Sequence, residues 1–174
     1  MLPKPHAPDD AIAQIARILD TSAGKEMMTL PAKAERLFDS LPHIIYLKRG
    51  VVTVRNTESR KIVMYFYAPS VVAMINDGFS CAHLYLRAET GCDIYQAALL
   101  DMQDNARFLF SLLRVLSYQT HCLFLRDEIN NAGCVYAQVR EGLLMLLDLP
   151  ETVRYLIVRL YFTAIGGFKS EVQR

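Results

Sequence analysis

The hydrophobic and polar positions along this 174-residue chain follow two different periods. From residue 30 to about residue 97, apolar residues alternate with polar ones in short runs that turn residues separate. Because successive side chains of a strand point to opposite faces, this alternation predicts β-strands. The expected strands cover residues 35–38, 43–48, 51–55, 61–67, 71–75, 83–88 and 92–95. Six or seven short strands at this spacing indicate an antiparallel sandwich or barrel.

Beyond Leu99 the apolar residues recur with a period of about 3.6, which predicts helices. Residues 106–129 contain neither proline nor glycine and form the longest expected helix. Its apolar stripe is too wide for one buried face, so its second side is expected to meet the same helix of a second copy across a two-fold axis. The predicted dimer interface consists of Leu109, Leu112, Leu113, Leu116 and Leu123.

Shorter helices are expected on both sides of these regions. Asp9 and Asp10 begin an amphipathic pattern that continues to Leu19, and their carboxylates suit the positive end of a helix. Residues 135–147 and 153–164 have helical patterns, with Pro150 between them. The chain therefore changes from mostly extended to mostly helical structure near its middle.

Composition narrows the class of protein. Apolar residues make up 52% of the chain and the formal net charge is +1, so neither a disordered protein nor a strongly basic nucleic-acid binder is expected. No leader sequence and no apolar run of about 18 residues is visible, which predicts a cytoplasmic protein without a membrane segment. The four cysteines, expected to be free thiols, are Cys81, Cys92, Cys122 and Cys134.

The residues offer little for catalysis. The four histidines lie far apart, and the cysteines lack the short paired spacing of a zinc site. Asp101 and Asp104 are three residues apart near a helix start, where acidic residues usually complement the helix dipole. The sequence contains no glycine-rich phosphate loop and no nucleophile elbow. We therefore predict a protein that is not an enzyme and that holds no metal or cofactor.

The stretches "YLKRGVVTVR", "KIVMYFYAPSVVAMI", "LYLRAETGCDIYQA" and "QVREGLLMLLDLP" follow one another in a recognisable order. This order resembles the sensor domain of the cyclic AMP receptor protein and FNR family of bacterial transcription regulators. The family has a Tyr-x-x-x-Gly-x-Val strand motif, and a motif of the type Arg-Ala-x-Thr-x-Cys-x-Val before its dimerisation helix. The residues in those places here are Tyr46, Gly50 and Val52, then Arg87, Ala88, Thr90, Cys92 and Ile94. The similarity covers about residues 35–150.

The sequence departs from this family at the nucleotide site. Cyclic-nucleotide binders of the family place Gly-Glu and then Arg-Ser or Arg-Thr where this chain has Ala73 and Met74, then Ala82 and His83. These four residues form a degenerate pocket without the carboxylate and guanidinium that hold ribose and phosphate, so cyclic AMP is not expected to bind. The first cysteine is Cys81, so the N-terminal cysteine cluster of an FNR-type iron–sulfur protein is missing as well.

The C-terminal end is a second departure. The stretch "GGFKSEVQR" resembles the turn and the first part of a recognition helix, but the sequence then ends without the rest of a winged helix-turn-helix. The resemblance implies that Lys169, Ser170 and Arg174 would face DNA. The alternative is that these nine residues form only a tail.

Together these observations predict an α+β protein: an antiparallel jelly-roll β-barrel, a long C-terminal dimerisation helix and a short helical C-terminal segment. Residues 1–130 are expected to form the sensor domain, with the dimerisation helix at 106–130, and residues 131–174 a partial helix-turn-helix. The predicted function is that of a homodimeric transcription regulator, with weak DNA binding and an unidentified small effector. Alternatives are a stand-alone ligand-binding or protein-interaction module and, less favoured, a small cupin-like enzyme.

Overall fold

The computed structural model describes residues 7–22, 24–37, 43–74 and 83–131. The chain divides into two compact units, one of which comprises Pro5–Leu123. The other comprises Met1–Lys4 with Phe124–Arg174, and of this unit only residues 124–131 are described. The division between a sensor domain and a segment 131–174 stays a prediction, because residues 132–174 lie outside the described part.

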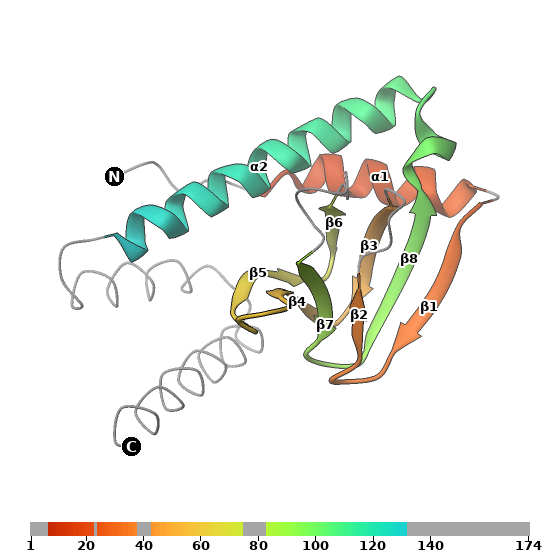
Figure 1. The fold of residues 1–174 in the computed structure, drawn as a ribbon. Helices are drawn as coiled ribbons and strands as arrows, with labels where there is room; N and C mark the ends of the chain where they lie inside the picture. Colours follow the sequence, from red (N-terminus) through yellow and green to blue (C-terminus); the bar gives the residue numbers. More distant parts are fainter. Residues whose placement is uncertain (1–6, 23, 38–42, 75–82, 132–174) are drawn as a thin grey trace, which may run out of the picture. The chain divides into compact units, whose positions relative to one another are not determined.

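Two helices, a short 3₁₀ helix and eight strands make up the described structure (Figure 1). In chain order they are α1 (Asp9–Thr21), β1 (Glu26–Leu30), β2 (Glu35–Leu37), β3 (His43–Arg49), β4 (Val51–Asn56), β5 (Ile62–Tyr67), β6 (Ser70–Met74), β7 (Leu84–Ala88), β8 (Cys92–Ala98), η1 (Leu99–Met102) and α2 (Ala106–Asn130). The seven strands expected from the alternating pattern and the long helix after Leu99 are therefore present, and β1 is an addition.

The strands form two antiparallel four-stranded sheets. Sheet A has the order β1-β8-β3-β6 and sheet B the order β2-β7-β4-β5. The expectation of a barrel was wrong: the described strands form no hydrogen-bonded ladder from one sheet to the other, so the fold is an open jelly-roll sandwich. Successive strands β5 and β6 belong to different sheets, and Pro69 between them has no backbone N–H with which to continue a ladder.

Strands β3, β6 and β8 of sheet A are buried on both faces, which explains why they contain consecutive apolar residues. Ile44 and Val71 point toward α1 and α2, where they join a core cluster with Ile15 and Phe108. The next residues along each strand point to sheet B, and so Ile45 belongs to a second core between the sheets. A half-exposed sheet would have polar residues at every second position instead.

Gly50 allows β3 to pass directly into β4 of the opposite sheet. Its φ angle is +99°, a conformation that residues with a Cβ atom rarely adopt. A Cβ atom at this position would lie 2.6 Å from the Cys92 sulfur and 2.6 Å from the Gly91 carbonyl oxygen. The glycine of the strand motif is thus required by both backbone conformation and space.

Helix α2 is fixed to the rest of its unit by polar as well as apolar contacts. The Gln119 side chain is buried, and its Nε2 donates a hydrogen bond of 2.6 Å to the Val71 carbonyl on β6. Because β6 is an edge strand of sheet A, this hydrogen bond ties α2 to the edge of the sheet.

Helices α1 and α2 are also joined by an ion pair. Both Asp10 carboxylate oxygens accept hydrogen bonds from the Arg114 guanidinium, one of them over 2.9 Å. These hydrogen bonds hold the Asp10 pKa below its ordinary value of 3.8. Asp10 is thus more acidic in the folded chain than in the unfolded chain.

We expect the contribution of this ion pair to stability to depend on pH. A carboxyl group whose pKa is lowered by folding stabilises the native state above its unfolded pKa, and this contribution disappears as pH falls through the folded pKa. Asp10→Asn should therefore lower the melting temperature at neutral pH, and the difference from wild type should vanish well below pH 3.8. Thermal unfolding across this range measures it, with Asp9→Asn as the control for loss of a helix-end charge. A difference that persists unchanged in acid would contradict the prediction.

Candidate functional site

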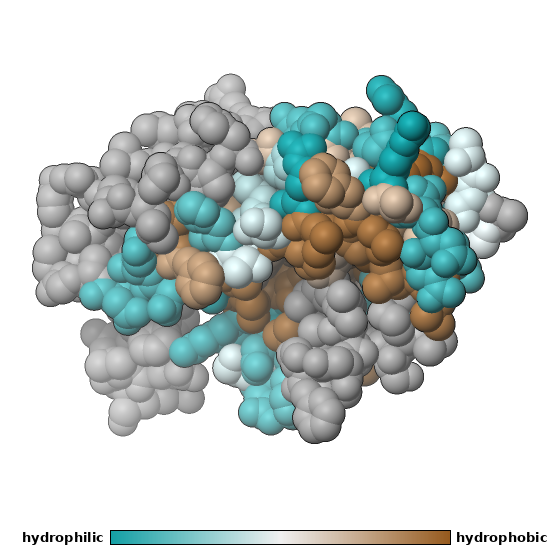
Figure 2. Space-filling model, turned by 90° about the horizontal axis from the view of Figure 1, so that it is seen from above, coloured by the Kyte–Doolittle hydropathy of each residue, from teal (hydrophilic) through white to brown (hydrophobic). Residues whose placement is uncertain are grey.

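The side of α2 that faces away from the core carries an apolar seam. Leu109, Leu113, Leu116 and Leu123 follow one another in steps of four, three and seven residues, with Thr120 between the last two. This spacing is that of the a and d positions of a coiled coil. Figure 2 shows hydrophobic side chains gathered on the face seen from above, where α2 runs in Figure 1.

The burial of these residues separates two roles within α2. Leu113 is 64% exposed, Leu109 and Leu123 are also exposed, and Leu116 is half-buried at the border of the core. Leu112 is different, because it packs into the core with Phe108 and Val115 and is therefore unavailable to a partner. Phe110, which was not among the interface residues expected from the sequence, is next to Leu109 and is exposed.

By length and composition alone, residues 106–128 would also satisfy the minimum for a membrane-spanning helix. One side of this helix is occupied, however, by contacts with α1 and sheet A through Phe108, Leu112 and Val115. The core helix of a water-soluble protein can have the same length and composition. These two properties alone therefore do not identify α2 as a membrane-spanning helix.

The predicted pocket residues do not line a single described surface. Ala73 is buried on β6 but points toward α1 and α2 rather than into the space between the sheets. His83 is exposed in a turn before β7, with its Nδ1 3.8 Å from a Glu58 carboxylate oxygen. Met74 ends β6, and Ala82 lies outside the described residues.

The space between the two sheets is filled mainly by apolar side chains. Phe66 and Leu86 belong to this inter-sheet core, and Met64 packs at its border. Its other buried members are Ile45, Leu47, Val52, Val54, Val72, Ala88, Cys92 and Ile94. None of these side chains carries a charge, so none of them could neutralise a phosphate.

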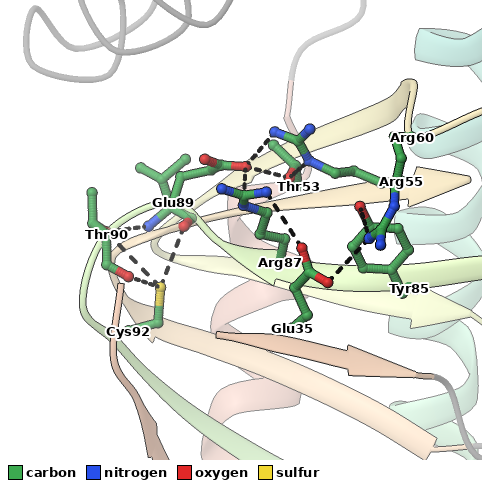
Figure 3. Close-up of polar contacts among 10 residues, drawn as sticks. Glu35, Thr53, Arg55, Arg60, Tyr85, Arg87, Glu89, Thr90 and Cys92 are labelled. Atoms are coloured by element: carbon green, nitrogen blue, oxygen red, sulfur yellow. Dashed lines mark hydrogen bonds and ion pairs between the residues drawn. The ribbon is translucent and has the colours of Figure 1, made fainter. Parts of the chain in front are cut away.

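The outer face of sheet B carries a charged network that the sequence analysis did not identify (Figure 3). Its members come from β2, β4, β7 and the turns beside them: Glu35, Thr53, Arg55, Arg60, Tyr85, Arg87 and Glu89. Cross-strand register explains the cluster, because Glu35 faces Arg87 on β7 and Thr53 faces Arg87 from β4. Side chains from three strands therefore meet at one place on the sheet.

Glu89 is the buried centre of this network. Only 6% of its side chain is exposed, and its Oε1 accepts hydrogen bonds from Thr53 Oγ1 at 2.7 Å and Arg55 Nη2 at 2.8 Å. At the other end of the network, Glu35 pairs with Arg87 and Arg60. Each carboxylate is neutralised by arginine, so the network ties strands together and offers no unpaired acid or base.

The buried thiols are not activated. Burial raises the pKa of Cys92 and of Cys122, so both remain protonated at neutral pH. Burial likewise raises the pKa of Tyr118, one helical turn before Cys122. Among the described residues, moreover, no group of three His, Cys, Asp or Glu side chains could hold a metal ion.

No protein-family model and no curated protein sequence matches the chain. Solved structures do match its fold. The c-di-GMP-responsive global regulator CLP of Xanthomonas campestris superimposes with a TM-score of 0.62 at 18% identity, over 80% of this chain and 73% of that one. A transcriptional regulator of the crp/fnr family from Eubacterium rectale has a TM-score of 0.58 at 12% identity, with 76% and 66% covered.

A third structure matches the sandwich itself. A cyclic nucleotide-binding domain from Methylobacillus flagellatus has a TM-score of 0.54 at 13% identity, and 74% of this chain and 89% of that domain are covered. At these identities the likeness shows the fold alone, a cyclic-nucleotide-binding-like sandwich.

Proposed function

We propose that this chain is a regulatory, non-enzymatic homodimer: a transcription regulator whose sensor sandwich does not bind cyclic AMP and whose DNA-binding segment is partial. The observation that carries the proposal is the combination of a sensor-type sandwich with a long helix whose outer side exposes a coiled-coil seam. The seam supports dimerisation through Leu109, Leu113, Leu116 and Leu123, together with Phe110. A homodimer would present two copies of any DNA-binding segment, as symmetric operators require.

Cyclic AMP is expected not to bind with useful affinity. The inter-sheet core is apolar, and Ala73, which stands where the family has the first residue of its ribose-binding pair, points away from that core. A cyclic phosphate buried there would lack a charge-assisted partner, and such a loss typically costs about 3–5 kcal/mol. Isothermal calorimetry should detect no binding at micromolar nucleotide, and micromolar affinity would contradict the prediction.

DNA binding by the 174-residue chain is expected to be weak and largely non-specific. Of the proposed contact residues, Lys169, Ser170 and Arg174, all of which lie outside the described residues, only two are cations. Two phosphate contacts per subunit, or four per dimer, predict a log–log salt dependence with a slope of about −4. Titration of promoter fragments and random duplex at several salt concentrations measures both slope and selectivity.

The same titration separates the proposal from its alternative. Selective nanomolar binding at physiological salt would show that the chain recognises a DNA sequence. The proposal of a partial DNA-binding segment would then have to be abandoned. No binding even at low salt would favour a stand-alone ligand-binding or protein-interaction module.

A further inference from the structure

A buried polar side chain, Gln96 on β8, borders the inter-sheet core. Gln96 is only 5% exposed, and its Oε1 is buried without a hydrogen-bond partner. The other buried glutamine of the described chain, Gln119, uses its amide to bond the Val71 carbonyl. Gln96 is therefore a buried amide whose oxygen no described group of the protein satisfies.

Strand register places Gln96 on the inner face of sheet A. Cys92 and Ile94, two and four residues earlier on β8, both belong to the inter-sheet core, and side chains two residues apart share a face. Directly opposite Gln96 on β3 is Ile45, another member of that core. The amide thus sits on the apolar interior face, near the end of β8 that leads into η1 (Figure 1).

An acceptor in this position is costly to keep. Transfer of an amide from water to an apolar interior is unfavourable unless its hydrogen bonds are replaced. A methionine or leucine would fill similar space without that cost, so the amide serves no packing purpose that an apolar residue could not serve. A ligand with a hydrogen-bond donor would satisfy the oxygen.

We propose that Gln96 is the recognition residue for a small uncharged effector with an apolar body and one N–H or O–H donor. This inference rests on the proposed sensor function and names the ligand class that the sandwich takes. The apolar side chains of Ile45 and Val72 would contact the body of the effector, and Gln96 Oε1 would accept a hydrogen bond from its donor. An anion is disfavoured, because Glu26, a carboxylate, pairs with Gln96 in the strand register on β1.

Phenol, toluene and benzoate test the proposal as probes of matched size. The ¹H–¹⁵N signals of the Gln96 side-chain amide, assigned by their loss in Gln96→Met, report binding at this place only. Phenol should shift these signals and bind about 2- to 10-fold more tightly than toluene, the range expected for one net hydrogen bond. Benzoate should bind more weakly than either. Equal affinities for phenol and toluene, or no shift with any probe, would overturn the proposal.

The variant Gln96→Met supplies a second and independent readout. Without ligand, it should melt about 2–4 °C higher than wild type, because it removes an unsatisfied acceptor. It should also lose the preference for phenol over toluene. A lower melting temperature would show that the amide has a structural partner, and the proposal would fail. Gln103→Met, on the exposed end of η1, controls for added hydrophobicity. Neither readout depends on dimerisation or DNA binding, so this inference can fail while the regulator proposal stands.

Discussion

Replacing Phe110 and Leu113 together with lysine is expected to convert a dimer into folded monomers. Both side chains are about two-thirds exposed on α2, so the variant loses no core packing. Burial of each is worth about 1.5–3 kcal/mol, and a two-fold interface loses both residues from both protomers. Mass measurement by light scattering should give about half the wild-type value, with an unchanged circular dichroism spectrum.

Leu37 provides a matched control for this experiment. It is as exposed as Leu113, at 65% against 64%, but lies on β2 of sheet B. Leu37→Lys should leave the dimer intact. If the double variant stays dimeric, the interface lies elsewhere on the molecule.

Glu89→Ala is expected to destabilise the protein by about 3–5 kcal/mol, the usual cost of removing one partner of a buried ion pair. The substitution leaves the Arg55 guanidinium, whose side chain is 14% exposed, without its carboxylate. It also removes the acceptor of the buried Thr53 hydroxyl. Urea unfolding followed by circular dichroism measures the change in free energy.

Two further variants divide this loss into its parts. Thr53→Val keeps the shape of the side chain but removes both the donor to Glu89 and the acceptor of the Arg55 Nε–H. It should therefore cost about 1.5–3 kcal/mol, the range for hydrogen bonds to charged groups. Glu35→Ala breaks more exposed ion pairs and should change stability by no more than about 1 kcal/mol. A loss for Glu89→Ala as small as that for Glu35→Ala would show that the centre of the network is solvated.

Alternation of apolar residues was sufficient to predict seven strands, because six of them, β3 to β8, bury side chains on at least one face. The exception is β2, whose residues are exposed or half-buried. It did not predict β1, whose exposed positions include Met27 at the edge of sheet A. The end of β8 was also placed too early, at residue 95 instead of Ala98. An edge strand is held extended by its hydrogen bonds to a single neighbouring strand. Here that neighbour, β8, is distant in the sequence.

The width of the apolar stripe on α2 correctly indicated that more than one side is apolar, but it could not assign the sides. Leu112 and Leu113 are adjacent and equally hydrophobic, and only the packing of α2 against α1 distinguishes them. The charged network was invisible for a related reason. Thr53 and Glu89 meet only after β4 pairs with β7, and the amino-acid pattern does not encode this register.

The strand order also has a consequence for how the protein is made. Of the six pairings between the described strands, only that of β4 with β5 joins consecutive strands. β1 pairs with β8 and β2 pairs with β7, and both partners are synthesised much later. Neither sheet can be completed until the last strands have left the ribosome, and non-local pairing of this kind slows folding. The apolar strands made first are therefore exposed during synthesis, when a chain is most vulnerable to aggregation and most dependent on chaperones.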